Sequence, residues 1–189
     1  MRDYQEEELI KRVEGLPTFE GWKKGMYDIW IRSKSDAFNK FDDTVYTFEC
    51  CEDGEKPNSI YRSTGTSNAG ANGLLHFNEY NDLGCAVLKS DIIVYDSHYH
   101  GKHRGRYNAY QQLKGFPYFR DNNKNRKAEE IGKEYNNIIG ANCHKAGKKS
   151  TQIDGWSTAC LVRNVEAEFN EWMKIMDKRK LSVCILKEF

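Results

Sequence analysis

Residues 26–33, MYDIWIRS, indicate the class of fold, because their side chains alternate in a way that suits an extended chain. Met26, Asp28 and Trp30 would lie on one side of a strand, and the residues between them on the other. Further along the chain, short strand-like runs recur, and clusters of Gly, Asn, Asp and Ser that predict turns separate them. We therefore expect a mainly β (α+β) fold. The further predicted strands are residues 44–51, 59–65, 73–77, 85–95, 107–113 and 116–120.

Three other segments have apolar residues at helical spacing. Residues 3–13 form the first, which Gly15-Leu16-Pro17 would end. Residues 125–138 and 164–180 form the other two, and Asn164 is the expected cap of the last. We expect the apolar stripes to pack on the core. The stripes are Leu9, Ile10 and Val13; Ile131, Tyr135 and Ile138; and Val165, Phe169, Trp172, Met173 and Met176.

The charge balance argues against a nucleic-acid partner, since 29 basic and 28 acidic residues nearly cancel. No apolar run is long enough to span a bilayer, so no membrane partner is expected. The charged N-terminal sequence MRDYQEEELIKRVEG does not resemble a signal peptide, which predicts that the protein is made in the cytoplasm. The chain has no internal repeat and no linker, so we expect one domain over residues 1–189.

The cysteines are expected to be reduced, because the six of them form no CxxC pair and the chain shows no export signal. Four lie among apolar or β-forming neighbours and are predicted to be small buried core residues. These four are Cys50, Cys51, Cys85 and Cys184.

The other two cysteines are Cys143 and Cys160, and Cys160 forms a candidate catalytic pair with His144. Alternation in a strand that ends at His144 would turn Cys143 into the core and His144 to the opposite face. A second strand, entering at Ser157, would carry Cys160. If the two strands pair, the imidazole of His144 can face the Cys160 thiol and lower its pKa to about 3.5–7.5.

This segment resembles the catalytic domain of the L,D-transpeptidases of the YkuD type, whose hallmark is a His, a loop, then Ser/Thr-His-Gly-Cys. Here His144 is followed by Ser157-Thr158-Ala159-Cys160. It is most similar to a divergent branch in phage and phage-like bacterial genes, with Asn-x-His and then Trp-Ser-Ala-Gly-Cys. Further landmarks in the family's order cover residues 38–176: NKFDDTVYTF, YRSTGTSN, GCAVLKSD, GKHRGRYNAYQQ and FRDNN.

The resemblance implies a β-sandwich or bent sheet with peripheral helices over residues 25–189, after an N-terminal helical extension, residues 1–24. It implies that Cys160 is the nucleophile, His144 the general base and Ser157 a residue that shapes the site. Substrate contacts are expected from His103, Asn142, Trp156, Thr158 and Ala159.

The sequence departs from the family pattern in two places. Thr158 and Ala159 replace the usual His and Gly, although such small residues would still let backbone N–H groups stabilise an oxyanion. The Arg often found two positions after the nucleophile is displaced to Arg163, which leaves the residue that anchors a substrate carboxylate unassigned.

The reaction implied by the resemblance is attack of the thiolate on a peptidoglycan stem peptide, at the bond after the L-centre of diaminopimelate or an equivalent diamino acid. An amine would resolve the acyl-enzyme as a crosslink, and water would trim the stem. No cofactor or metal is expected at this site. Because this substrate lies in the periplasm or cell wall, we expect delivery by a phage lysis pathway, a virion or a secretion system. The sequence identifies no immunity or delivery protein.

Two other readings stay open. DSHYHGKH could hold zinc through Asp96, His98 and His100 or His103, with an open position for an activated water, as in zinc hydrolases. Alternatively, the domain could be a non-catalytic module that binds cell-wall peptides, which would suit the missing His-Gly pair. Such a module needs no activated Cys160.

Overall fold

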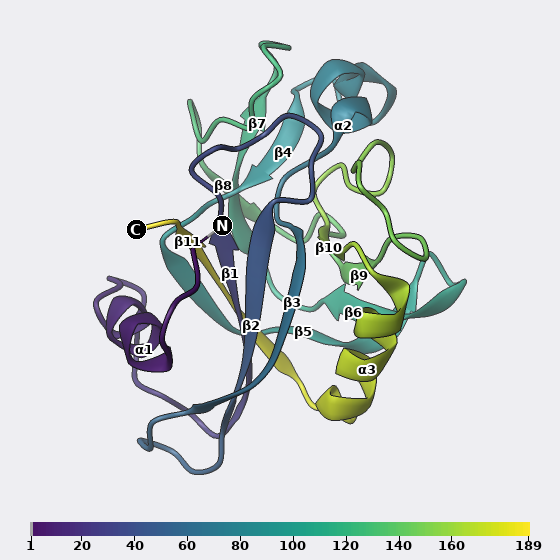
Figure 1. The fold of residues 1–189 in the computed structure, drawn as a ribbon. Helices are drawn as coiled ribbons and strands as arrows, with labels where there is room; N and C mark the ends of the chain where they lie inside the picture. Colours follow the sequence, from purple (N-terminus) through teal and green to yellow (C-terminus); the bar gives the residue numbers. More distant parts are fainter. Residues whose placement is uncertain (1) are drawn as a thin grey trace.

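The computed structural model describes residues 2–189 and shows a closed barrel of eight strands (Figure 1). The mainly β class is confirmed, and the expected sandwich or bent sheet takes the form of this barrel with a smaller sheet beside it. In barrel order the strands are β1 (Gly25–Arg32), β11 (Leu181–Lys187), β5 (Ile92–His103), β6 (Tyr107–Gln112), β9 (Cys143–Lys145), β10 (Leu161–Arg163), β3 (Asn58–Thr66) and β2 (Asp43–Cys50).

The smaller sheet lies at the upper end of the barrel in Figure 1, next to α2. It consists of β4 (Cys85–Leu88), β7 (Phe116–Asp121) and β8 (Tyr135–Asn137), in that order and antiparallel. The α-helices are α1 (Glu6–Glu14), α2 (Ala71–Leu75) and α3 (Glu166–Met176), and a 3₁₀-helix spans Phe77–Glu79. Within residues 2–189 no helix is long and apolar enough to cross a membrane.

Both faces of β1 are buried, which explains why its sequence is apolar almost throughout. Met26 and Trp30 point into the barrel, where α3 contributes Trp172 to the same core cluster. Tyr27, Ile29 and Ile31 instead pack on the outside with α1, whose buried stripe is the predicted Leu9, Ile10 and Val13. The barrel interior and the α1 interface are therefore two separate apolar cores.

A charged pair lies inside the barrel. Arg163 donates to Asp28 at 2.8 Å, and neither side chain has any exposed surface. Arg163 also donates to Ser63 Oγ at 3.0 Å and lies 3.9 Å from the ring centroid of Trp172. Because Asp28 in turn accepts hydrogen bonds from Thr47 and Trp172, the buried charges are paired and satisfied.

The helix predicted over residues 125–138 is wrong. The backbone there is irregular and ends in β8. Asn123 and Asn125 accept hydrogen bonds from backbone N–H groups two residues further on, which competes with helix formation. Arg126 and Gly132 have φ angles of 68° and 80°, outside the helical range.

Four other predictions need correction. Residues 73–77, predicted as a strand, lie in α2 and the 3₁₀-helix, and residues 85–95 divide into β4 and β5 at a turn where Asp91 has a φ of 55°. Val165 caps α3, because the Asn164 side chain instead bonds to Thr64 Oγ1 and the Ser150 carbonyl. All six cysteines are free, but Cys51 is exposed rather than buried.

Candidate active site

His144 lies at the centre of β9 and is buried, with 1% of its surface exposed. Its Nδ1 lies 2.8 Å from the Lys145 carbonyl oxygen and 3.2 Å from the Tyr107 hydroxyl. Because a carbonyl oxygen only accepts, Nδ1 carries the ring proton and the lone pair is on Nε2. That Nε2 is buried and has no hydrogen-bond partner among residues 2–189. The imidazole is thus held in the tautomer of a base.

Cys160 immediately precedes β10 and is 8% exposed. The Ser157 hydroxyl donates to the Cys160 carbonyl oxygen at 2.8 Å, which fixes the backbone that carries the thiol. The thiol itself donates to the Gly140 carbonyl oxygen at 3.5 Å. Ser157 therefore acts through backbone geometry, as a residue that shapes the site.

His103 completes a compact group with these two residues. One ligand atom from each of His103, His144 and Cys160 lies within 4.8 Å of the others. The two imidazole rings are 4.1 Å apart between centroids and inclined by 34°. Asn142 links His103 to the barrel, since its Oδ1 accepts from the Gln112 backbone at 3.1 Å and its Nδ2 lies 3.3 Å from His103 Nδ1.

Burial keeps both members of the candidate pair neutral. Burial, together with neighbouring His103, lowers the pKa of His144 to about 3, against the backbone carbonyls of Lys145 and Trp156. Burial also raises the pKa of Cys160 to about 11, although a backbone hydrogen bond from Asn142 acts in the opposite direction. The expected lowering of the thiol pKa by an ion pair is therefore not found, because burial keeps both groups uncharged. A thiolate at Cys160 would therefore form only if its proton passed to a base such as His144.

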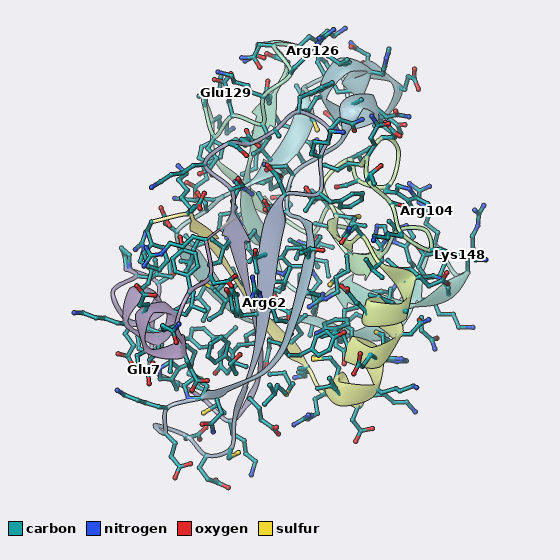
Figure 2. The ribbon with its side chains drawn as sticks, viewed as in Figure 1. Glu7, Arg62, Arg104, Arg126, Glu129 and Lys148 are labelled. Carbon is teal, nitrogen blue, oxygen red and sulfur yellow. The ribbon has the colours of Figure 1, made fainter. Side chains whose placement is uncertain are left out.

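A pocket of about 170 Å³ opens on the three residues. Tyr107, Trp156 and Thr158 line its wall, and Trp156 is 41% exposed. Arg104 and Arg106 also line the pocket and are exposed, so its surroundings are positively charged. In Figure 2, Arg104 lies on the same side of the molecule as Lys148, which belongs to the loop between β9 and β10.

A second pocket of about 250 Å³ adjoins the same backbone segment. Thr158 lines both pockets, whereas Ala159 lines only the second. Arg120 lies in the wall of the second pocket, where it donates to the Gly84 carbonyl oxygen at 3.0 Å. Within the described part of the chain Arg120 forms no ion pair, since neighbouring Asp121 instead accepts backbone hydrogen bonds from Asn123 and Glu129.

The loop that leads to Cys160 is held close to α2. The Gly70 N–H donates to the Ser157 carbonyl oxygen at 3.0 Å. A Cβ at Gly70 would lie 2.4 Å from the Asp154 carbonyl oxygen, so only glycine permits this approach. The hydrogen bonds found over residues 2–189 include none from the backbone N–H groups of Ala159 and Cys160. These groups are free to bind an acceptor beside the thiol.

The predicted strand pairing is partly wrong. β9 and β10 do pair, in parallel, but His144 is opposite Val162, and both Ser157 and Cys160 precede the strand. Cys160 meets His144 because it lies just before the start of β10, diagonally across the ladder from His144. Cys143, on the other face, is fully buried in the core as predicted.

The predicted site residues divide into three groups, of which the third is Ala159 alone, in the wall of the second pocket. His103, Trp156 and Thr158 line the pocket with Cys160 and His144. Asn142 and Ser157 do not line it and act as supports through the contacts given above. Sequence reasoning missed Tyr107, Arg104 and Arg106. Their signal was present in GKHRGRYNAYQQ, where a histidine, two arginines and a tyrosine surround the β5–β6 turn.

The zinc site suggested at DSHYHGKH is not formed. Both ring nitrogens of buried His98 are engaged, by Ser97 Oγ at 2.8 Å and the Ala141 carbonyl oxygen at 2.7 Å. Asp96 has a φ of 50° at an irregularity of β5 and points toward Lys180, so the simple alternation fails there. Over residues 2–189 the group that could hold a metal is instead His103, His144 and Cys160.

Comparisons with known proteins identify no relative of this chain. No protein-family model matches the chain, no curated protein matches it, and no solved structure matches its fold.

Proposed function

We propose that this protein is a cysteine-dependent acyltransferase or hydrolase that acts on peptidoglycan stem peptides. The observation that carries the proposal is buried His144, whose Nε2 has no hydrogen-bond partner among residues 2–189. One ring nitrogen of His144 lies within 4.8 Å of the Cys160 thiol, and both residues line an open pocket. Leaving such an atom unsatisfied costs stability, which suits a group that accepts a proton during a reaction.

In the proposed reaction, Nε2 of His144 takes the thiol proton as the sulfur attacks the carbonyl carbon of the donor. The free backbone N–H groups of Ala159 and Cys160 stabilise the oxyanion, in place of the family's usual Gly-containing turn. The protonated imidazole then gives its proton to the leaving amine, and a thioester remains on Cys160. A second amine or a water attacks the thioester and returns the thiol.

The substrate class rests on the resemblance described above and on the charge of the two pockets. Arg163, the displaced family arginine, is fully buried against Asp28 and cannot reach a substrate. Arg120 remains available in the pocket next to Thr158. We assign to it the free carboxylate of the donor, because an unpaired guanidinium binds carboxylates in a bidentate manner.

The substrate also implies where the enzyme would act. Stem peptides lie in the periplasm or cell wall, so delivery by a phage or a secretion system is part of the proposal.

The direct test is mass analysis of muropeptides after sacculi are incubated with the protein. Wild type should change the set of stem lengths or crosslinks, and Cys160→Ala should change nothing. Cys51→Ala is the matched control, because it removes an exposed thiol outside the site. Equal amounts of product from wild type and Cys160→Ala would exclude Cys160 as the nucleophile.

A non-catalytic module that binds cell-wall peptides is the second candidate. The observation in its favour is the pKa of Cys160, which burial raises to about 11. The rate of iodoacetamide alkylation against pH separates the two candidates in the presence of donor peptide. An enzyme should form an acylated, unreactive thiol, whereas a module should protect the thiol only while the peptide stays bound.

A further inference from the structure

We propose that His103, His144 and Cys160 bind one zinc ion, and that the bound ion blocks the nucleophile. The two imidazoles and the thiol come from three separate segments, namely the end of β5, β9 and the residue before β10. Their ligand atoms lie within 4.8 Å of one another. Zinc is the ion of choice for mixed nitrogen and sulfur donors, whereas Mg²⁺ and Ca²⁺ prefer oxygen.

The spacing is close to that of a tetrahedral site. Zinc bonds of about 2.0–2.1 Å to nitrogen and about 2.3 Å to sulfur place neighbouring ligand atoms roughly 3.5 Å apart. The three atoms therefore need to draw together by about 1.3 Å at most, from up to 4.8 Å to roughly 3.5 Å. His103 is the ligand best able to move, because it is only partly buried at the end of its strand.

His144 already has the environment of a zinc ligand. Its Nδ1 proton is donated to the Lys145 carbonyl oxygen, the outer contact that zinc-bound histidines usually make. Its Nε2 is buried without a partner in the described chain. The contact between Asn142 Nδ2 and His103 Nδ1, at 3.3 Å, is long for a hydrogen bond, so it is the one that zinc binding would displace.

The fourth position faces the pocket. The pocket of about 170 Å³ has room for a water or a small anion on the ion. Arg104 and Arg106 oppose a cation, but both are exposed to solvent that screens their charge. The same arginines favour an anion as fourth ligand. The thiol proton leaves to solvent on binding, so the ligand is a thiolate.

The bound ion would block the reaction because it occupies the lone pairs that the reaction needs. In the bound state the Nε2 lone pair of His144 and the sulfur of Cys160 are both held by the ion, so neither base nor nucleophile is free. This consequence rests on the proposed function, whereas the binding does not.

The test is titration of the full chain with Co²⁺, followed by displacement with Zn²⁺. One Co²⁺ per chain should give the ligand-field bands of a tetrahedral ion and a sulfur-to-cobalt charge-transfer band, and Zn²⁺ should remove both. Cys160→Ala and His103→Asn should weaken binding more than about 100-fold, since loss of an outer contact alone costs 10–100-fold. Cys51→Ala and His100→Asn, which lie outside the group, should bind as wild type does.

Absence of a saturable site, or a charge-transfer band that persists in Cys160→Ala, would refute the proposed zinc binding. On muropeptides, added zinc should inhibit and a chelator should restore activity. Inactivation by the chelator would overturn the blocking role, because the ion would then be needed for the reaction. A cobalt site on a protein that changes no muropeptide would leave the binding intact and exclude only the proposed enzyme.

Discussion

Replacing Arg163 by Met should lower the free energy of unfolding by about 3–5 kcal/mol, the usual cost of removing one partner from a buried ion pair. Asp28 would keep its hydrogen bonds from Thr47 at 2.7 Å and Trp172 at 3.3 Å, but its charge would be unpaired in the barrel. Arg163 has no exposed surface, so water cannot take its place without disturbing the core.

A double-mutant cycle with Asp28→Asn isolates the ion pair. The asparagine keeps an oxygen for Thr47 and Trp172, and Arg163→Met keeps most of the volume beside the Trp172 ring. Asp28→Asn/Arg163→Met removes both charges, so it should lose at least about 1.5 kcal/mol less than the sum of the single variants.

Urea unfolding followed by tryptophan fluorescence measures all four proteins. If the double variant loses the sum of the singles within about 0.5 kcal/mol, the two charges do not interact and the reasoning is refuted.

Three further predictions concern separate parts of the molecule. Cys143→Ala should cost about 1–2 kcal/mol in urea unfolding and keep activity on muropeptides, because Cys143 is a core residue; a loss of activity without a loss of stability would contradict this. Arg120→Met should lower kcat/KM about 10–100-fold for donors with a free carboxylate and leave kcat/KM for amidated donors unchanged. An equal loss for both donors would exclude Arg120 as the residue that binds the carboxylate. Burial lowers the pKa of His98 to about 4, so the unfolded chain binds a proton first as pH falls below about 6.5, and stability falls with it. Between pH 7 and 5, His98→Gln should therefore lose about 2 kcal/mol less than wild type in unfolding free energy, whereas an identical pH profile would mean that folding does not shift the pKa of His98.

The strands were predictable wherever side chains alternate or lie between two cores. Residues 26–33 and 44–51 correspond to β1 and β2 within one residue at each end. Barrel closure was not predictable, because it depends on pairing between β1 and β11, strands almost at opposite ends of the chain. The wrong helix at 125–138 had the apolar spacing of a helix, but asparagine side chains accept from the backbone N–H groups of Asn125 and Lys127 at its start.

The proximity of His144 and Cys160 was predicted from two short segments, although through a pairing that differs from the observed one. What could not be predicted was the electrostatic state, since it depends on burial from several elements. That burial raises the pKa of Cys160 and lowers that of His144. The approach of the His103 ring to the His144 ring also needs the β5–β6 hairpin to pair with β9.

The nucleophile is tested most directly by the intact mass of the protein after brief mixing with a stem tetrapeptide. We predict a mass increase equal to the acyl part of the peptide, located on Cys160 by fragmentation, absent in Cys160→Ala and accumulating more slowly in His144→Ala. An adduct on another residue, or muropeptide turnover by Cys160→Ala, would contradict the assignment of Cys160 as the nucleophile.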